Sequence, residues 1–188
     1  MRAILFISTS VLVLALMLVA RAERPKSADA LAAAPQSVVY DADSAFEFIK
    51  TMVGEWNRSS GDHDHGSTSH AVTFRVTAAG SSVLETIFPG DDNEMLSVYH
   101  MDGDNLLLTH YCALQNAPIL KFEKSDKPGE IKFAFQGGTN FDPQVDLHVH
   151  EGTFKIKDAN TVESTFITFA DNKPRPALSA VIKRKVAK

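Results

Sequence analysis

The stretch GDHDHGSTSH, from Gly61 to His70, contains three histidines and two aspartates within ten residues. Imidazole nitrogens suit zinc, copper and nickel, so these residue types fit a metal site. Structural zinc sites, however, use rigid ligands at recurring separations, usually including cysteine, whereas glycines flank the His63-Asp64-His65 run. We therefore interpret the stretch as a mobile polar hairpin loop; weak, opportunistic binding of zinc, copper or nickel is the alternative.

A second histidine pair lies in the run DLHVH. His148 and His150 are two residues apart, so on a strand they point to the same side with Cβ atoms about 7 Å apart. Such a pair can chelate one ion when a third ligand comes from a neighbouring strand. Leu147 and Val149 alternate with the histidines as the expected inward residues, so we expect the histidines to face solvent.

Familiar catalytic signatures are absent from the sequence. It contains no Gly-x-Ser-x-Gly, no phosphate-binding glycine loop, no His-Glu-x-x-His and no Cys-x-x-Cys. Glu85 and Glu163 lie in expected strands, where an inward carboxylate would be a candidate acid or base, although exposed strand faces also carry glutamate. Nothing in the residues requires an enzyme, and we assign no catalytic residue from the sequence.

The first 22 residues have the pattern of a secretory signal. Arg2 precedes an apolar run that ends at Ala20, and Ala20-Arg21-Ala22 provides small residues for cleavage before Glu23. The alternative is an uncleaved anchor, because about 18 apolar residues can just span a bilayer. We predict cleavage after Ala22 and a secreted or periplasmic product that meets the membrane only through this signal segment.

Composition and charge narrow the possible partners. The chain has 188 residues, of which 44% are hydrophobic and 22% charged, as in an ordinary soluble domain. Removing Arg2 and Arg21 leaves 17 of the 19 basic residues against 23 acidic ones, a net charge of -6. Nucleic acid is therefore not an expected partner. Cys112 is the single cysteine, so no intrachain disulfide can form and stability must come from packing.

Residues 23–43 mix alanine, proline and charge without a period, which predicts a flexible tether. Ser44 and Glu47 then fit a capping box at the start of a short helix. Phe46, Ile49 and Val53 fall on one helical stripe, and Gly54 is the expected stop signal.

After Gly54 the apolar period changes to two, which predicts β-strands. Including a strand that starts at Trp56, about ten are expected; the others are Ala71–Thr77, Ser82–Phe88, Met95–Met101, Leu106–Ala113, Ile119–Lys124, Ile131–Gln136, Leu147–Ile156, Thr161–Phe169 and Leu178–Val186. No segment between them is long enough for a crossover helix, so sequential strands should be antiparallel neighbours. Closing the sheet on itself removes its two edges. Residues 44–188 are therefore predicted to form an all-β, antiparallel up-and-down barrel of about ten strands with a short N-terminal capping helix; a two-sheet sandwich is the alternative.

The order of helix, Gly54-Glu55-Trp56 and a meander ending in a basic strand resembles the calycin barrels: lipocalins, fatty-acid-binding proteins and the nitrobindin-like haem barrels. The resemblance implies that Trp56 lies across the closed end, with Arg184 packed over its ring and Lys183 behind it. The nitrobindin-like pattern continues with further glycines, and this chain has Asn57-Arg58-Ser59 instead. The run LTHYC is also similar to a family of secreted bacterial proteins of unassigned function, which supports the fold.

Hairpin geometry predicts which side chains share a face around the turn between Asp102 and Asn105. With two residues in that turn, one face holds Met95, Ser97, Tyr99, Leu106, Leu108, His110 and Cys112. The other face holds Leu96, Val98, His100, Leu107, Thr109 and Tyr111. We assign the first face to the lumen, because bulky apolar groups with a few polar ones are typical of a small-molecule pocket. The alternative is that His110 is a satisfied core histidine and Cys112 a small buried hydrophobe.

These patterns favour a barrel that binds a small hydrophobic molecule in its lumen. The expected contacts are Tyr99, His110, Cys112, Met95 and Leu108. One alternative is a metal- or haem-binding barrel that uses His110 or the His148/His150 pair. Another is a barrel enzyme with His110 as general acid or base. The sequence identifies neither a cofactor nor an oligomeric state.

Overall fold

The computed structural model describes residues 34–60 and 71–185. The predicted signal segment, the first part of the predicted tether and the GDHDHGSTSH loop lie outside these residues. Within them, no helix is both long and apolar enough to cross a bilayer.

The described chain contains short helices and many strands. In order they are η2 (Pro35–Ser37), α1 (Ala42–Thr51), β1 (Gly54–Ser60), β2 (Ala71–Thr77), η3 (Ala78–Gly80), β3 (Ser82–Ile87), β4 (Met95–Asp102), β5 (Asn105–Tyr111), β6 (Ala117–Glu123), β7 (Glu130–Thr139), β8 (His148–Asp158), β9 (Thr161–Ala170), β10 (Lys173–Pro174) and β11 (Leu178–Arg184).

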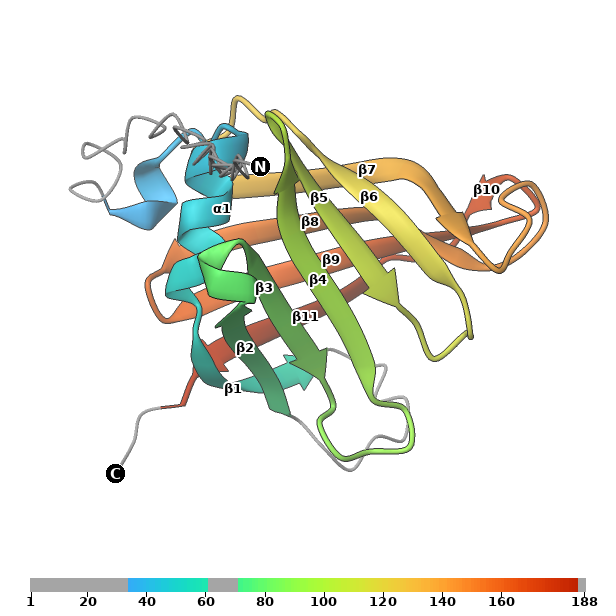
Figure 1. Ribbon diagram of the computed structural model, residues 1–188, viewed down its shortest axis with the longest axis horizontal. Helices are drawn as coiled ribbons and strands as arrows, with labels where there is room; N and C mark the ends of the chain where they lie inside the picture. Colours follow the sequence, from blue (N-terminus) through green and yellow to red (C-terminus); the bar gives the residue numbers. More distant parts are fainter. Residues whose placement is uncertain (1–33, 61–70, 186–188) are drawn as a thin grey trace, which may run out of the picture.

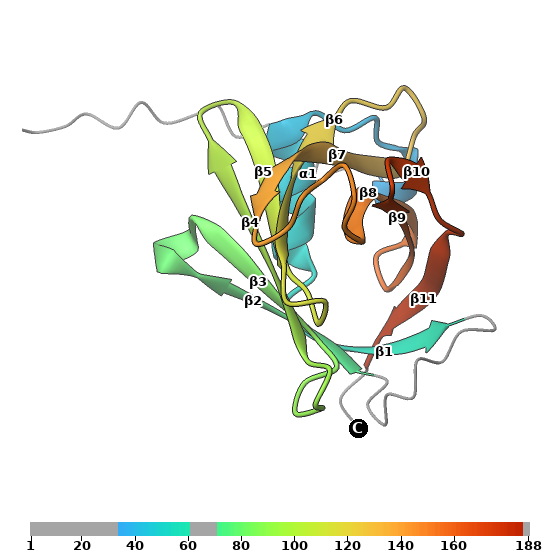
Figure 2. The same cartoon turned by 90° about the vertical axis from the view of Figure 1, so that its right-hand side faces the viewer.

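The strands form a closed antiparallel ring. Consecutive strands from β1 to β9 are hydrogen-bonded neighbours, β11 pairs with β9, and β11 also returns to β1. The two-residue β10 only adds to one end of β9, so ten strands make up the barrel. Figures 1 and 2 show the ring, with α1 lying across one end of it. The predicted all-β barrel with a short helix is confirmed, and the sandwich alternative is wrong.

The helix α1 begins earlier than the sequence predicted. Asp41 is its N-cap: the Ser44 amide donates to the Asp41 carboxylate at 2.8 Å, and the Asp41 amide donates to the Ser44 hydroxyl at 2.9 Å. The capping box therefore runs from Asp41 to Ser44, and the predicted box from Ser44 to Glu47 is wrong. Val53 lies beyond the last helical residue and is 46% exposed, so it does not belong to the buried stripe.

The segment before α1 packs on the barrel. Tyr40 is only 3% exposed, and its hydroxyl donates to the Pro35 carbonyl at 2.9 Å. The Gly129 amide, in the turn before β7, donates to the Val38 carbonyl at 2.7 Å. In its described part, the stretch predicted to be a flexible tether is thus fixed to the domain from about Pro35 onward.

One arginine joins the helix end to the first and last strands. Arg184 is the cross-strand partner of Trp56, and its guanidinium lies 4.4 Å from the Trp56 ring centroid. The same guanidinium donates to the carbonyls of Thr51 and Val53, both at 2.8 Å, which satisfies acceptors at the end of α1. The indole N–H of the fully buried Trp56 donates to the Met52 carbonyl at 2.7 Å.

Aromatic rings fill much of the interior. Tyr99 packs against Phe133 and Phe154 with ring centroids 6.0 and 6.4 Å apart, and Trp56 packs edge-on against Phe74 at 6.2 Å. All five side chains are at most 3% exposed. The barrel interior toward α1 is therefore a packed core.

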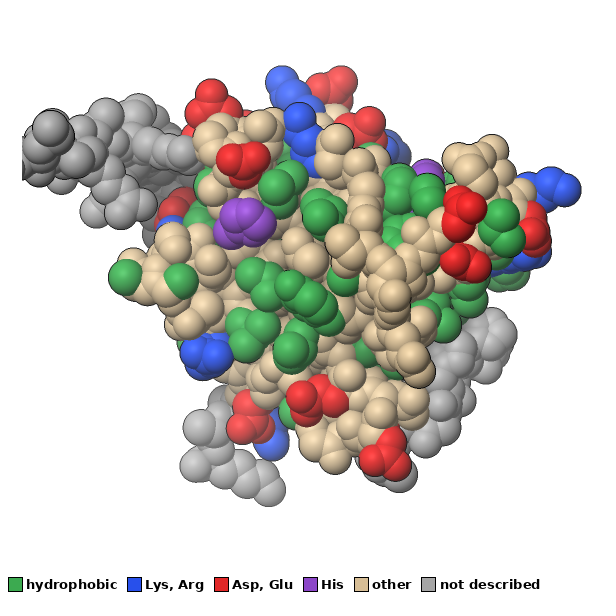
Figure 3. Space-filling model, turned by 45° about the vertical axis from the view of Figure 1, so that its right-hand side comes forward, with side chains coloured by type: hydrophobic (Ala, Val, Ile, Leu, Met, Phe, Trp, Pro, Cys, Tyr) green, Lys and Arg blue, Asp and Glu red, His purple; other side chains and the backbone are tan. Residues whose placement is uncertain are grey.

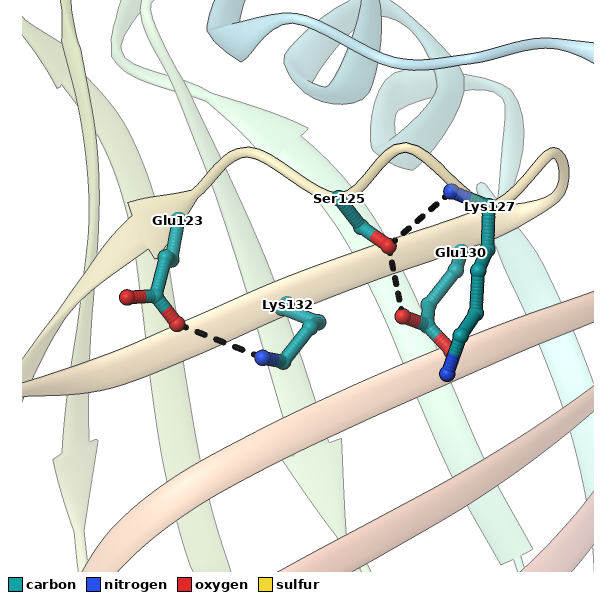
Figure 4. A network of polar contacts seen from close by, with 5 residues as sticks. All are labelled: Glu123, Ser125, Lys127, Glu130 and Lys132. Atoms are coloured by element: carbon teal, nitrogen blue, oxygen red, sulfur yellow. Dashed lines mark hydrogen bonds and ion pairs between the residues drawn. The ribbon is translucent and has the colours of Figure 1, made fainter.

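A polar network shapes the turn between β6 and β7 (Figure 4). The Ser125 hydroxyl donates to the Glu130 carboxylate at 2.6 Å and accepts from the Lys127 amide at 3.2 Å. Across the same hairpin, Lys132 donates to Glu123 at 3.3 Å. Glu130 is only 6% exposed, so its hydrogen bond to Ser125 compensates for burial of the carboxylate. The network holds the turn in the conformation that presents Gly129.

We predict that Gly129→Ala destabilises the fold by about 1–3 kcal/mol. Gly129 has a φ of +71°, and a Cβ there would lie 2.8 Å from the Gln36 carbonyl oxygen and 3.1 Å from that of Ile156. Urea unfolding measures the loss. Gly103→Ala is the control, because Gly103 has a φ of +59° but nothing within 4 Å of an added Cβ. Equal losses in the two variants would contradict the steric explanation.

We also predict that Arg184→Ala lowers the free energy of unfolding by about 1–3 kcal/mol, since it removes the cation–π contact and two hydrogen bonds to carbonyls. Arg184→Lys should lose part of this amount, because an ammonium keeps the charge without the planar fork. The exposed neighbour Lys183, changed to alanine, should remain within about 0.5 kcal/mol of the parent. If Arg184→Ala also lowers the free energy of unfolding by no more than about 0.5 kcal/mol, the contact between Arg184 and Trp56 does not stabilise the closed end of the barrel.

Candidate functional site

Three polar side chains form a row across neighbouring strands of the barrel. Glu85 on β3 is the cross-strand partner of Ser97 on β4, and Ser97 is the partner of His110 on β5. Their exposed fractions are 5%, 2% and 8%, so all three are buried. We call Glu85, Ser97 and His110 the polar row. It places a carboxyl, a hydroxyl and an imidazole side by side in an otherwise apolar interior.

Each member of the row has a hydrogen-bond partner nearby. The Ser97 hydroxyl lies 3.0 Å from Nδ1 of His110, and the Tyr99 hydroxyl donates to the Glu85 carboxylate at 2.6 Å. Tyr99 is the next inward residue of β4 and is completely buried. Because its ring is packed against Phe133 and Phe154, Tyr99 holds the Glu85 carboxyl in a fixed position.

Burial dominates the electrostatics of the row. It raises the pKa of Glu85, against the opposing effect of hydrogen bonds from Tyr99 and Ser97. It lowers the pKa of His110 to about 4 and raises the pKa of Tyr99 well above its usual value. In residues 34–60 and 71–185, none of the ion pairs includes Glu85. Each of these shifts favours the uncharged form of its group.

The structure places the predicted ligand residues at different depths. The register pairs Tyr99 with Leu108 and Asp102 with Asn105, so the β4–β5 turn has two residues and the face chosen as the lumen points inward. Tyr99 and Leu108 are at most 1% exposed and belong to the packed core. Met95 is only half-buried, at the start of β4.

Cys112 lies just beyond β5 and is also half-buried. Its backbone amide donates to the Asn116 carbonyl at 3.0 Å, within the turn between β5 and β6. Burial raises the pKa of its thiol. The thiol is therefore a soft, neutral group near one end of the polar row.

The opposite face of β4 and β5 is apolar as well. Leu96, Val98 and Leu107 are only half-buried there, and Tyr111 is 52% exposed. Figure 3 shows hydrophobic side chains gathered in the middle of one face of the molecule, with charged groups around them. Because apolar residues lie on both faces of β4 and β5, the sequence alone does not show which face is inside. The burial of the side chains distinguishes the two faces.

Glu85 is the residue of this site that sequence reasoning left open. The signal was present within its own strand, because Glu85 alternates with Val83 and Ile87, which makes it part of an apolar face. The other candidate carboxylate, Glu163, lies on the surface, where Lys157 pairs with it at 2.9 Å. The two glutamates therefore have different roles despite similar positions in predicted strands.

The prediction that both histidines face solvent is wrong for His148, whereas His150 is half-buried and Val149 is buried as expected. His148 is fully buried, whereas Leu147, expected to point inward, is 41% exposed. The pairing of β8 with β9 has a bulge between Val149 and Glu151, and this bulge interrupts the strict alternation on which the prediction relied. Phe141 covers His148 with ring centroids 4.8 Å apart.

Two successive hydrogen bonds join the Asp146 carbonyl, His148 and His150. Nδ1 of His148 lies 2.8 Å from the Asp146 carbonyl oxygen, so it must carry the donated proton. In the neutral ring, Nε2 of His148 is then an acceptor for Nδ1–H of His150 at 3.1 Å. The His150 ring stacks on Phe169 and Phe135, with centroids 3.8 and 4.8 Å away. Burial lowers the pKa of His150, and the neighbouring His148 adds to this effect.

Metal coordination by this pair lacks a third protein ligand in the described part of the chain. No group of three or more His, Cys, Asp or Glu side chains there is arranged to hold a metal ion. The pair therefore does not form a closed structural site of the zinc type within residues 34–60 and 71–185.

Comparisons with known proteins yield little beyond these observations. No family model matches the sequence, and no match is found among curated proteins. Among solved structures, the crystal structure of Rv2717c from M. tuberculosis is similar at 15% sequence identity and a TM-score of 0.49, covering 76% of this chain and 98% of that one. At these values the likeness carries no information about function, and we interpret the site from its own residues.

We predict that acidification destabilises the protein through His110. The folded-state pKa of about 4 lies below the ordinary value of 6.5, so the stability linked to the neutral imidazole is present above pH 6.5. It is lost progressively as the pH falls from 6.5 toward 4, by up to about 3 kcal/mol. Urea unfolding at several pH values measures the slope.

His110→Phe should flatten this slope, because the imidazole that must become charged is gone. His100→Phe, on the outer face of β4, is the matched control and should retain the parental slope. If both variants keep that slope, burial of His110 is not the cause of the acid sensitivity.

Proposed function

We propose that this chain is a calycin-like barrel, exported after removal of residues 1–22, that binds a small and mostly apolar molecule in its interior. The observation that carries the proposal is the polar row of Glu85, Ser97 and His110, which is buried on an apolar wall and has no ion-pair partner within residues 34–60 and 71–185. Ligand pockets are typically apolar with a few fixed polar groups that orient the bound molecule. The row fits that description.

His110 is the residue that we expect to contact the ligand's polar group. Its Nδ1 is engaged by Ser97, and no hydrogen bond among the described residues uses Nε2. The side chain retains 8% exposure, in contrast to the fully enclosed Tyr99. Nε2 is therefore the ring nitrogen that remains for a bound molecule.

The other proposed contacts contribute shape and position. Met95 and Cys112 are half-buried, soft side chains on the same face as His110, and they suit an apolar ligand body. Tyr99 and Leu108 belong to the packed floor beneath it, and Tyr99 also positions Glu85. The contact of Arg184 with Trp56 supports the calycin-like assignment, because the resemblance implies that pair at the closed end.

A metal- or haem-binding barrel is the second candidate, and the hydrogen bond that His150 donates to His148 favours it. Its Nδ1–H is donated to His148, so its Nε2 carries a lone pair in the neutral ring. Metal-bound histidines usually donate their other ring N–H in this way, which fixes the tautomer and the ring orientation. If a metal complex is bound, His150 would supply one nitrogen ligand through Nε2.

Native mass spectrometry of the protein purified from its own cells tests the proposal. We expect a retained apolar small molecule, which His110→Ala should lose and the control His100→Ala should keep. A bound metal or a Soret band that disappears in His150→Ala would favour the second candidate instead. A barrel that retains nothing and binds no added apolar probe would contradict the proposed function.

A further inference from the structure

Glu85, Ser97 and His110 are direct cross-strand neighbours, so hydrogen bonds along the polar row can run in only one direction at a time. The Ser97 hydroxyl has one hydrogen, and it lies between the imidazole of His110 and the carboxyl of Glu85. When Ser97 donates to Nδ1 of His110, the neutral imidazole carries its proton on Nε2, and the Ser97 oxygen accepts from a protonated Glu85. When Nδ1–H of His110 donates to Ser97, the hydroxyl donates to a Glu85 carboxylate, and Nε2 of His110 is an acceptor.

The surroundings of Glu85 decide between these two directions. The groups that face it are Phe74, its cross-strand partner on β2, and Ser97, Tyr99 and His110 on β4 and β5. Phe74 has no charge, and the two hydroxyls are neutral donors. No lysine or arginine of the described chain pairs with Glu85.

A carboxylate that is buried without a cation is strongly disfavoured relative to its protonated form. The burial that raises the pKa of Glu85 and lowers that of His110 acts in the same direction. The row therefore runs from the Glu85 carboxyl through Ser97 to Nδ1 of His110. The proton left on the ring is at Nε2, the nitrogen to which no other described residue is hydrogen-bonded.

We infer that His110 presents an N–H donor to the barrel interior and that the bound molecule is an apolar compound with a carbonyl oxygen. This inference rests on the proposed function and specifies the ligand class for the same site. A carbonyl oxygen accepts from Nε2–H and leaves the row unchanged. A protonated amine cannot accept, and it would require the opposite direction of the row, with Glu85 charged.

Three probes with the same carbon skeleton test this choice: methyl naphthyl ketone, the corresponding naphthylethylamine and ethylnaphthalene. Isothermal titration calorimetry measures the dissociation constant of each. The ketone should bind about three- to tenfold more tightly than ethylnaphthalene, the amount expected for one net hydrogen bond. The amine should bind more weakly than ethylnaphthalene, because its charge must be desolvated without a counterion.

Matched variants connect the preference to the row. His110→Phe should remove the advantage of the ketone, so that the ketone and ethylnaphthalene bind this variant with similar dissociation constants. Glu85→Gln should keep the advantage, because the amide N–H donates to Ser97 as the protonated carboxyl does. Ser97→Ala removes the hydroxyl between Glu85 and His110 and changes the side-chain volume less than His110→Phe does. This variant should reduce the advantage of the ketone. His100→Phe is the control and should behave like the parent.

The possible failures are distinguishable. If the amine binds more tightly than the ketone and Glu85→Gln removes that binding, Glu85 is a carboxylate and the inference is overturned. If all three probes bind equally to the parent and to His110→Phe, the pocket stands but the N–H donor does not. If none of the probes binds and no molecule is retained by the native protein, the proposed function fails and the inference fails with it.

Discussion

The pairing of β11 with β1, held by the contact between Arg184 and Trp56, is the interaction on which the rest of the structure depends. It joins the last strand to the first and attaches both to the carbonyls at the end of α1. Once the ring is closed, no strand in it has a free edge, and every second side chain along a strand is directed to the interior. A polar residue at an inward position is then buried whether or not it has a partner.

Closure therefore separates acidic residues into two groups with different chemistry. On the outside, Glu55, Glu123 and Glu163 each pair with a lysine at 2.8–3.3 Å and remain hydrated, so these contacts contribute little to stability. On the inside, Glu85 has only neutral donors, Tyr99 and Ser97. Outside the barrel a glutamate is a hydrated charge, whereas Glu85 inside it is a buried polar group that pairs with no lysine or arginine of residues 34–60 and 71–185. The polar row is a candidate ligand-binding site because the buried carboxyl of Glu85 has no positively charged partner among the described residues.

The interior is also divided along its length. Toward α1, tightly packed rings around Tyr99, Phe133 and Phe154 leave these side chains almost no exposure. Around Met95 and Cys112 the inward side chains are only half-buried. The polar row lies where β3, β4 and β5 pass from one region to the other, so its position combines rigid support on one side with accessible apolar groups on the other. On β8, a bulge breaks the alternation and brings His148 and His150 into a separate aromatic cluster.

The sequence by itself determined the approximate positions of the strands and their antiparallel order, and a two-residue turn then implied the register of the β4–β5 hairpin, because alternation and turn length are local properties of the backbone. It also placed Ser97, Tyr99 and His110 on one face, since that requires only a period of two and one turn. It did not determine the cap at Asp41, the burial of His148 or the partners of Glu85. These depend on contacts between residues far apart in the chain: the packing of the N-terminal segment on the β6–β7 turn, a bulge that shifts one strand against its neighbour, and closure that puts one of two apolar faces inside. Only the tertiary structure decides such features, because local periodicity carries no information about which surfaces meet.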